Sequence, residues 1–421
     1  MKNQLAIDDN RNTNKTKEKG FSLFLVFINI ILTILFPILS IPVSIVFMII
    51  NKGKARKWHG LLFALSMAIL AYIWEPGESM DLYRHHQQLS ILSGGNTNQL
   101  WLYITHSLEP IHYLIKYFVA QIGNYDLLQF LLVFIGYAEI TWLICDLSEV
   151  KMVSRKIFTI LLLYAVLGLN FIGFASGLWF YAATINTVLG IYLYYFRKTK
   201  YCHYLFFIIA PLLHMGTIYM ILAMIAFSIF PFFKKIRIHR LIIVATIAFL
   251  FGTITTIVSK IFGTDSIVAT LLNGKFTEYF VNGSQFDYLH TGWNLYLPIA
   301  NTVLSMILAI WHSKKYESDN NYFSSFVAYM AVFIFATILN AGVFVRYGFF
   351  IIMMNLPLIA DYLQYSKNKK RILLLLTTIA ILTGTRGYFS LRQIDSAGLY
   401  NRITLNTTRT TIELLEKKYE E

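Results

Sequence analysis

One short stretch of this chain concentrates side chains that can do chemistry. Residues 74–88 read W-E-P-G-E-S-M-D-L-Y-R-H-H-Q-Q and include Asp81, Arg84, His85 and His86, although only 14% of the 421 residues are charged. A guanidinium binds diphosphate through charge-assisted hydrogen bonds, and carboxylates and imidazoles transfer protons. A solvated loop at a membrane surface would also be charged, but it would not need this mixture. We therefore interpret the stretch as a site that binds a diphosphate and moves a proton.

A second group of ionisable residues follows in the segment 101–122. It contains Glu109, His112 and Lys116, which are costly in a helix that faces lipid. His112 and Lys116 are four residues apart and therefore share one face of a helix. We expect a single helix over this segment that lies at the membrane interface or is buried by the rest of the protein.

Two single residues stand out in later apolar runs. His214 lies in A-P-L-L-H-M-G, and Arg346 lies in F-V-R-Y-G. An ionisable residue within a membrane is by default a site hypothesis, and a guanidinium there needs an anionic partner. The alternatives are a histidine that only packs and an arginine whose charged end reaches the interface. We treat both residues as candidates for a site.

The region 263–292 interleaves aromatic and polar side chains. It includes Tyr279, Tyr288 and His290. Aromatic faces pack against the C–H faces of sugar rings, while neighbouring polar groups hydrogen bond to sugar hydroxyls. An aromatic belt at a membrane interface has a similar composition. Sugar binding by this loop is therefore a hypothesis that stands beside the interfacial one.

Composition determines the broad class of the protein. The chain is 57% hydrophobic and 16% aromatic, which is too apolar for a soluble domain of this length. Its net charge of +14 comes from short Lys and Arg clusters between apolar runs. That arrangement is typical of cytoplasmic loops near anionic lipid and does not indicate nucleic-acid binding. We predict a multi-pass protein of a cell membrane.

The apolar runs predict an all-α, polytopic transmembrane bundle of about 10–13 membrane segments. Residues 1–20 should form a polar cytoplasmic arm, 21–390 a single membrane domain, and 391–421 a polar tail. The run 21–50 is long enough for either a re-entrant hairpin or one tilted span, and 204–233 for two short helices. The predicted spans are 58–74, 127–147, 156–174, 177–196, 241–262, 293–312, 322–342, 346–364 and 371–386. The basic loops place the larger external loops at about 75–125 and 263–292.

Several common activities are disfavoured because their motifs are missing from the sequence. It contains no Walker A loop, no Rossmann glycine fingerprint, no H-E-x-x-H and no G-x-S-x-G. His85 and His86 resemble a metal pair only superficially, since adjacent side chains on a helix point about 100° apart. We therefore expect neither a cofactor nor a metal.

Four motifs together resemble a known family. These are D-L-Y-R-H-H, L-E-P-I-H-Y-L-I-K-Y about two dozen residues later, P-L-L-H-M-G, and a late F-V-R-Y. Their order over residues 60–365 resembles the Wzy-type capsular and exopolysaccharide polymerases, in their EpsG-like branch. The resemblance implies a fold like that of the GT-C membrane glycosyltransferases and a location in the bacterial plasma membrane.

The resemblance also implies roles for individual residues. Asp81 and Arg84 match the family's acidic-x-x-Arg element, Glu109 its Glu-Pro element, His214 its histidine and Arg346 its second arginine. Arg84 and Arg346 would hold the diphosphate, and Asp81 or Glu109 would be the catalytic base, with His85 and His86 the next candidates. Binding of substrate would extend to His112 and the loop residues named above. One departure is Trp179, because family members often carry an arginine after the Ser-Gly-Leu that precedes it here.

The activity implied is polymerisation of undecaprenyl-diphosphate-linked oligosaccharide units on the outer face of the membrane, without a metal. The expected partners are this lipid-linked substrate, membrane lipid, and a chain-length regulator and a flippase of the same pathway. Two alternatives stay open. A membrane O-acyltransferase would draw its acyl donor from the cytoplasmic side, and an exporter of lipid-linked sugars would carry charges on several spans along a central cavity.

Overall fold

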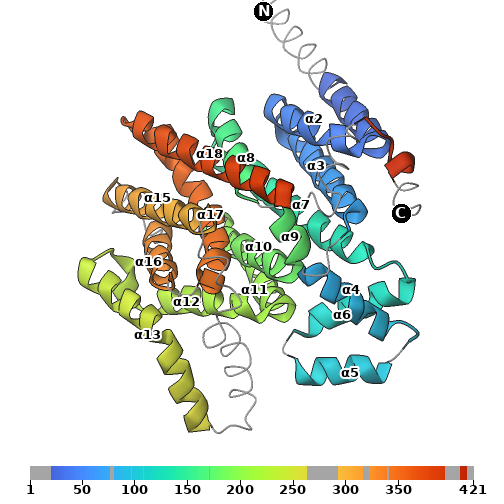
Figure 1. Ribbon diagram of the computed structural model, residues 1–421. Coiled ribbons are helices and arrows are strands. Elements are labelled where there is room, and N and C mark those ends of the chain that lie inside the picture. Colours follow the sequence, from blue (N-terminus) through green and yellow to red (C-terminus); the bar gives the residue numbers. More distant parts are fainter. Residues whose placement is uncertain are drawn as a thin grey trace, which may run out of the picture.

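The computed structural model describes residues 20–75, 80–95, 97–107, 109–169, 171–262, 293–315, 322–338, 341–393 and 408–414. Within these ranges all regular secondary structure is helical, which confirms the predicted all-α class (Figure 1). The helices are Gly20–Leu35, α2 Pro37–Ile50, α3 Gly53–Ile73, α4 Asp81–Leu92, α5 Thr97–His106, α6 Pro110–Ile122, α7 Leu127–Val150, α8 Arg155–Gly168, α9 Phe171–Ser176, α10 Leu178–Tyr192, η1 Leu193–Arg197, α11 Cys202–Leu213, η2 Met215–Thr217, α12 Ile218–Ile229, η3 Pro231–Lys234, α13 Ile238–Phe262, α15 Trp293–Lys315, α16 Phe323–Ala336, α17 Ala341–Tyr365 and α18 Lys369–Gln393.

Three of the described helices are long and apolar enough to cross a membrane, as expected for a membrane protein. They are Leu127–Val150 in α7, Leu295–Lys315 in α15 and Gly342–Tyr365 in α17. Several shorter helices are also apolar, among them Gly20–Leu35 and Phe323–Ala336. The coarse expectation of an apolar helical bundle is therefore confirmed, whereas the number of spans and the sidedness of the loops stay predictions.

The first apolar run is a helical hairpin. The chain turns at Phe36, next to Pro37, which cannot donate a backbone hydrogen bond. Polar side chains then pair across the two helices. The Asn29 amide donates to the Ser44 hydroxyl at 2.9 Å, and the hydroxyls of Thr33 and Ser40 lie 2.7 Å apart. Later residues of the first helix thus pair with earlier residues of α2, so the two helices run antiparallel. Of the two alternatives for 21–50, the structure has the hairpin.

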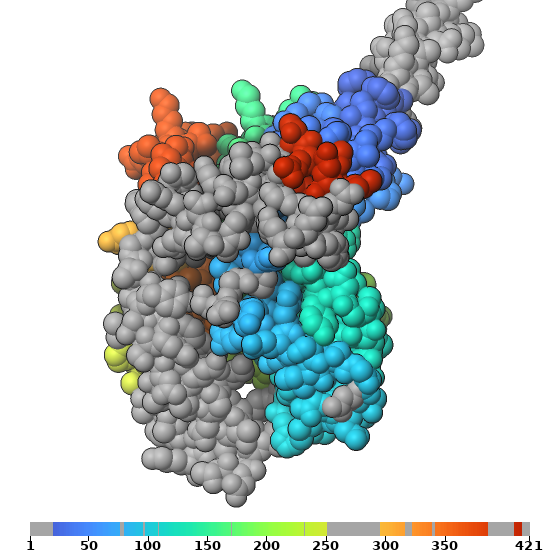
Figure 2. All heavy atoms as spheres, turned by 45° about the vertical axis from the view of Figure 1, so that its right-hand side comes forward, coloured from blue at the N-terminus to red at the C-terminus, as the bar shows by residue number. Residues whose placement is uncertain are grey.

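The C-terminal segment 408–414 packs on this hairpin. Leu414 joins a small buried cluster with Leu70 of α3, and the Thr411 hydroxyl donates to the backbone carbonyl of Ile34. Figure 2 shows the segment in red against the blue N-terminal helices. The contact lies near the turn of the hairpin and the last turns of α3, so this segment sits at the end of the bundle where α3 stops.

We name the two ends of the bundle by their composition. The histidine end is where α3 stops at Ile73 and where α4, α6 and η2 lie; the basic end is where α3 starts at Gly53 and α7 stops at Val150. In Figure 1, α4, α5 and α6 form a separate group below α7 and α10. One apolar core connects the two ends through α7, α10, α16 and α17. This core holds the polar side chains at both ends in fixed positions.

Two local predictions were wrong. The segment 101–122 is not one helix, because α5 ends at His106 and α6 begins only at Pro110. A proline disfavours helical backbone in the residue before it, and Glu109 accordingly has φ −115° and ψ 57°. The predicted span 156–174 is also interrupted, between α8 and α9. The run 204–233 forms two short helices, as expected, and they meet at His214.

Candidate functional site

A cluster of ionisable side chains surrounds one tryptophan at the histidine end. We call it the Trp179 cluster and define it as His85 of α4, Glu109, His112 and Lys116 of α6 and its N-cap, and Trp179 of α10. Three segments that are far apart in the sequence therefore meet in one place. His112, Lys116 and Trp179 are almost fully buried, so the polar groups of the cluster lie inside the protein.

Glu109 links this cluster to the break between α11 and α12. Its position follows from Pro110, which starts α6 and makes Glu109 the N-cap residue. One carboxylate oxygen lies 3.3 Å from Nδ1 of His112, one helical turn further on. The other oxygen accepts a hydrogen bond from the backbone N–H of Met215 at 3.0 Å. Glu109 is only 7% exposed, so both contacts lie inside the protein.

His112 and Lys116 use the same face of α6, as the sequence predicts. The His112 ring stacks on Trp179 with 3.9 Å between ring centroids, and Tyr113 stacks on its other side at 4.8 Å. Nζ of Lys116 lies 5.7 Å from the Trp179 ring and 5.5 Å from the Tyr113 ring. Aromatic faces attract cations at such distances. The His112 ring therefore lies between two aromatic rings, and the Lys116 amine lies near both of them.

Lys116 is fully buried, and the groups that hydrogen bond to it are neutral. Its Nζ donates to Nδ1 of His85 at 3.0 Å and to the amide oxygen of Gln88. Burial lowers the pKa of Lys116 to about 7, and the nearby charge of Glu109 opposes this shift only in part. The amine is therefore close to the point at which it can take up or release a proton near neutral pH.

His85 is fixed in one protonation state by the same contact. While Lys116 is protonated its ammonium can only donate, so Nδ1 of His85 then accepts and the proton of the neutral ring lies on Nε2. Burial, with the charges of Lys116 and His112, lowers the pKa of His85 to about 2. His85 is consequently neutral, and its Nδ1 is already engaged with Lys116.

His214 lies next to the cluster at the start of η2. Its Nδ1 accepts from the backbone N–H of Gly216 at 3.0 Å, and its ring meets Phe180 edge to face at 5.4 Å. The Tyr347 hydroxyl donates to the carbonyl of Gly216 at 2.7 Å. Tyr347 follows Arg346 on α17, so this contact brings the α17 segment that carries the predicted arginine to the histidine end.

The remaining predicted residues take different positions. Asp81 and Arg84 form an ion pair one helical turn apart on the exposed face of α4, with side chains 41% and 68% exposed. His86 points away from His85, and its Nε2 lies 3.0 Å from the Gln129 side chain. Arg346 is half-buried. The loop predictions Tyr279, Tyr288 and His290 lie outside the described residues.

Sequence reasoning gave little weight to Trp179 and Tyr347. Trp179 appeared only as a departure from the family pattern, and Tyr347 carries no charge that would mark it. Their positions depend on how α10 and α17 pack, which no local motif reports. Among the residues that the structure describes, no group of three or more His, Cys, Asp or Glu side chains is placed to hold a metal ion.

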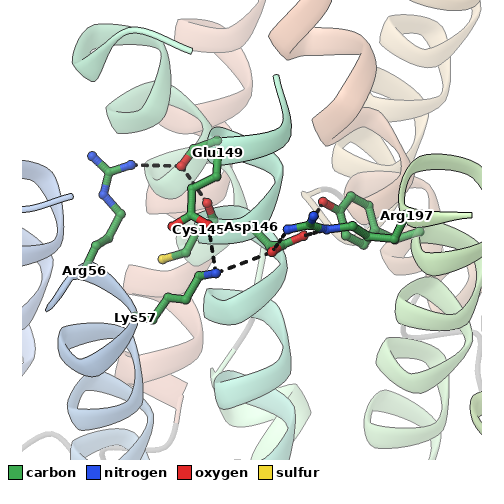
Figure 3. Close-up of polar contacts among 8 residues, drawn as sticks. Arg56, Lys57, Cys145, Asp146, Glu149 and Arg197 are labelled. Carbon is green, nitrogen blue, oxygen red and sulfur yellow. Dashed lines mark hydrogen bonds and ion pairs between the residues drawn. The ribbon is translucent and has the colours of Figure 1, made fainter. Parts of the chain in front are cut away.

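The basic end holds a second polar cluster, which is arranged differently. Figure 3 shows Asp146 of α7 between Lys57 and Arg197. Its oxygens accept from Lys57 at 3.4 Å, from Arg197 Nε at 2.7 Å and from the Tyr192 hydroxyl at 2.8 Å. Lys57 also pairs with Glu149 at 2.9 Å. Opposite charges match one another here, as expected of a cluster that fastens helices.

Comparison with protein-family models, with curated proteins and with solved structures finds no match to this chain. The resemblance to the Wzy-type polymerases therefore rests on the four short motifs. Three of them, carried by α4, α6 with its N-cap and η2, contribute residues to the histidine end. The fourth lies on α17, which reaches the same end through Tyr347.

Proposed function

We propose that this chain is a membrane polysaccharide polymerase that joins oligosaccharide units carried on a lipid diphosphate. The observation that supports this best is the position of Glu109, a buried carboxylate held by His112 and by the amide next to His214. The Glu109 carboxylate thus lies against the backbone next to His214, although the two candidates are more than a hundred residues apart in the sequence. An enzyme that transfers sugar to a hydroxyl needs such a fixed base.

In the proposed reaction, a hydroxyl of the acceptor unit attacks the anomeric carbon of the donor. A new C–O bond forms, the C–O bond to the diphosphate breaks, and the lipid diphosphate leaves with the bonding electron pair. The proton of the hydroxyl goes to the catalytic base. We assign this role to Glu109 rather than Asp81, because Glu109 is buried and accepts a backbone hydrogen bond whereas Asp81 is exposed and pairs with Arg84.

Charge on the leaving diphosphate would be stabilised by arginine. Arg84 is exposed on α4, and its present partner is the carboxylate of Asp81, one turn earlier. A diphosphate accepts stronger, bidentate hydrogen bonds and would replace the Asp81 carboxylate as the partner of the Arg84 guanidinium. Arg346 on α17 is the second candidate for the same role. In this scheme Asp81 holds Arg84 in position until the substrate arrives.

The function is tested by analysing glycolipids and polymer in cells that lack the chain and are complemented with wild type, Arg84→Ala or Arg84→Lys. We expect lipid-linked single units to accumulate and polymer ladders to vanish with Arg84→Ala, at unchanged protein level in the membrane. Lysine should restore the ladders only in part, because it keeps the charge but loses the planar fork.

Other outcomes of this experiment would overturn the proposal. Ladders of normal length that lack an acyl group would indicate an acyltransferase. Units that stay on the cytoplasmic face would indicate an exporter. Full ladders with Arg84→Ala would remove Arg84 from the site while leaving polymerisation open, which is why the deletion itself is the decisive comparison.

A further inference from the structure

A lateral groove lies on the side of the bundle, between α3, α7 and α10. It has a volume of about 430 Å³. Its walls are mainly apolar, with Trp58 and Leu61 on α3, Trp142 on α7 and Leu189 on α10. Both tryptophans and Leu61 are more than one-third exposed, so their apolar surface faces outward from the bundle. In a membrane, such a groove is open to the hydrocarbon of the lipid.

Positive charge lies at the basic end of the groove. Lys54 and Lys57 contribute to its lining and come from the first turns of α3. Lys57 is engaged with Asp146 and Glu149. Lys54 is exposed and forms no ion pair with any residue that the structure describes. The end of the groove therefore offers a cation that the protein itself does not neutralise.

An acidic residue further along the groove does not cancel this charge. Glu139 of α7 contributes to the lining, and one of its oxygens accepts from the Asn186 amide of α10 at 3.1 Å. It lies near the level of Gly60, because Thr141 on the next half-turn of α7 donates to the Gly60 carbonyl at 3.2 Å. Lys54 lies about six residues before Gly60 on α3, so it is ~9 Å along the helix axis from the level of Glu139.

We propose that this groove binds one phospholipid with an anionic headgroup, its phosphate at Lys54 and one acyl chain along Leu61 and Leu189. The complementarity has two parts. A phosphate meets the lysine that lacks a partner, and a hydrocarbon chain meets the apolar walls. Tryptophan side chains are enriched where headgroups meet hydrocarbon, and Trp58 and Trp142 take that position here. The lipid would come from the leaflet at the basic end.

This site is independent of the proposed polymerase chemistry, which lies at the histidine end. A bound lipid would contact α3, α7 and α10, and α10 also carries Trp179. It would therefore hold together helices that position the Trp179 cluster without touching the reacting groups. Loss of lipid binding and loss of polymerisation can be measured separately, so failure of one proposal does not decide the other.

Native mass spectrometry of the purified full chain tests the proposal, with phosphatidylglycerol and phosphatidylcholine of equal chain length as probes. We expect one phosphatidylglycerol per chain, held in preference to phosphatidylcholine. Lys54→Gln should weaken phosphatidylglycerol binding about fivefold, the effect of one lysine near an anionic surface. Leu61→Trp should weaken binding of both lipids, because it fills the groove.

Lys52→Gln is the matched control, since Lys52 is exposed two residues before Lys54 and does not contribute to the groove. Binding that falls equally in Lys52→Gln and Lys54→Gln would show only general attraction to a basic surface and would overturn the site. Equal binding of the two lipids by the wild type would also overturn it. If Leu61→Trp fails to fold, the two lysine variants still decide the question.

Discussion

The two ends of the bundle both carry buried polar residues, but they satisfy them differently. At the basic end Asp146 is surrounded by Lys57, Arg197 and a tyrosine hydroxyl. At the histidine end Lys116 hydrogen bonds only to neutral groups, and burial lowers its pKa to about 7. A matched set of charges fixes helices together. A buried lysine held by neutral partners is costly, and strongly perturbed groups of this kind cluster at functional sites.

The basic end contains another buried carboxylate that is paired with basic side chains. Lys151, just after α7, donates to both oxygens of Asp361 on α17 at 2.7 Å, and His312 of α15 lies 3.2 Å from the same carboxylate. These contacts tie α7, α15 and α17, which are the three helices among the described residues that are long and apolar enough to cross a membrane. We infer that the basic end holds the bundle together while the histidine end is adapted for chemistry.

The largest effect on activity is expected for Glu109→Gln. The amide keeps the shape of the side chain but cannot accept a proton, so the rate of polymerisation should fall by about 10²–10⁴, the usual contribution of a general base. Polymer formed per unit time by purified protein in lipid vesicles is the measurement. Glu149→Gln, at the basic end, is the matched control and should retain most activity. An active Glu109→Gln protein would exclude Glu109 as the base.

The largest effect on stability is expected for Asp146→Asn. The carboxylate is 2% exposed, and its loss leaves Lys57 and Arg197 without their shared partner. We expect destabilisation by about 3 kcal/mol, near the low end for breaking a buried pair, because Arg197 keeps 41% of its side chain exposed. Thermal unfolding of the detergent-solubilised protein measures this. An unchanged melting temperature would contradict the fastening role of the basic end.

Lys116→Met should change how stability depends on pH. The pKa of Lys116 falls from an ordinary value of 10.5 to about 7 in the folded protein. Between these values the unfolded chain binds a proton that the folded protein lacks, so this group makes the wild type more stable as pH rises from 7 to 10. The slope is about 1.4 kcal/mol per pH unit.

Methionine at position 116 removes this contribution, so the stability advantage of Lys116→Met over the wild type should shrink from pH 7 to pH 10. Melting temperatures at several pH values measure the difference. The exposed Lys52→Met variant is the control and should follow the wild type. If the melting temperatures of the wild type and of Lys116→Met change in parallel with pH, burial does not lower the pKa of Lys116 as described.

The smallest effect is spectroscopic. Because the protonated Lys116 amine donates to Nδ1 of His85, the neutral ring should carry its proton on Nε2 at pH 5 to 6, below the pKa of Lys116. Solid-state NMR of the protein labelled with ¹⁵N-histidine distinguishes the two tautomers, and His85→Asn identifies the signal that belongs to this residue. A His85 signal that becomes doubly protonated near pH 6 would contradict the buried lysine contact.

Much of the fold could be predicted from hydropathy alone. Apolar runs such as 127–147 became helices with nearly the expected bounds, since membrane-length apolar segments have few other options. The break at Pro110 could also have been foreseen, because the residue before a proline resists helix. The hairpin in 21–50 could not be decided, since its evidence is the pairing of Asn29 with Ser44 across two helices.

The site was predictable only in part. Unusual residues such as Glu109 and His214 are visible in the sequence because ionisable groups are rare in apolar runs. The contact of Glu109 with the backbone of Met215, next to His214, joins α6 to the break between α11 and α12, and the stacking of His112 on Trp179 joins α6 to α10. Local patterns do not report such long-range packing. Likewise, the sequence marks Lys116 as unusual in an apolar segment but does not reveal that its partners are His85 and Gln88.

The most direct test of the two-ended account measures stability and polymerisation together in Glu109→Gln and Asp146→Asn. We predict that Glu109→Gln melts close to the wild type and makes little or no polymer. Asp146→Asn should melt at a lower temperature but retain polymerisation at temperatures where it stays folded. If Glu109→Gln unfolds and Asp146→Asn is stable but inactive, the roles assigned to the two ends are reversed and the account is wrong.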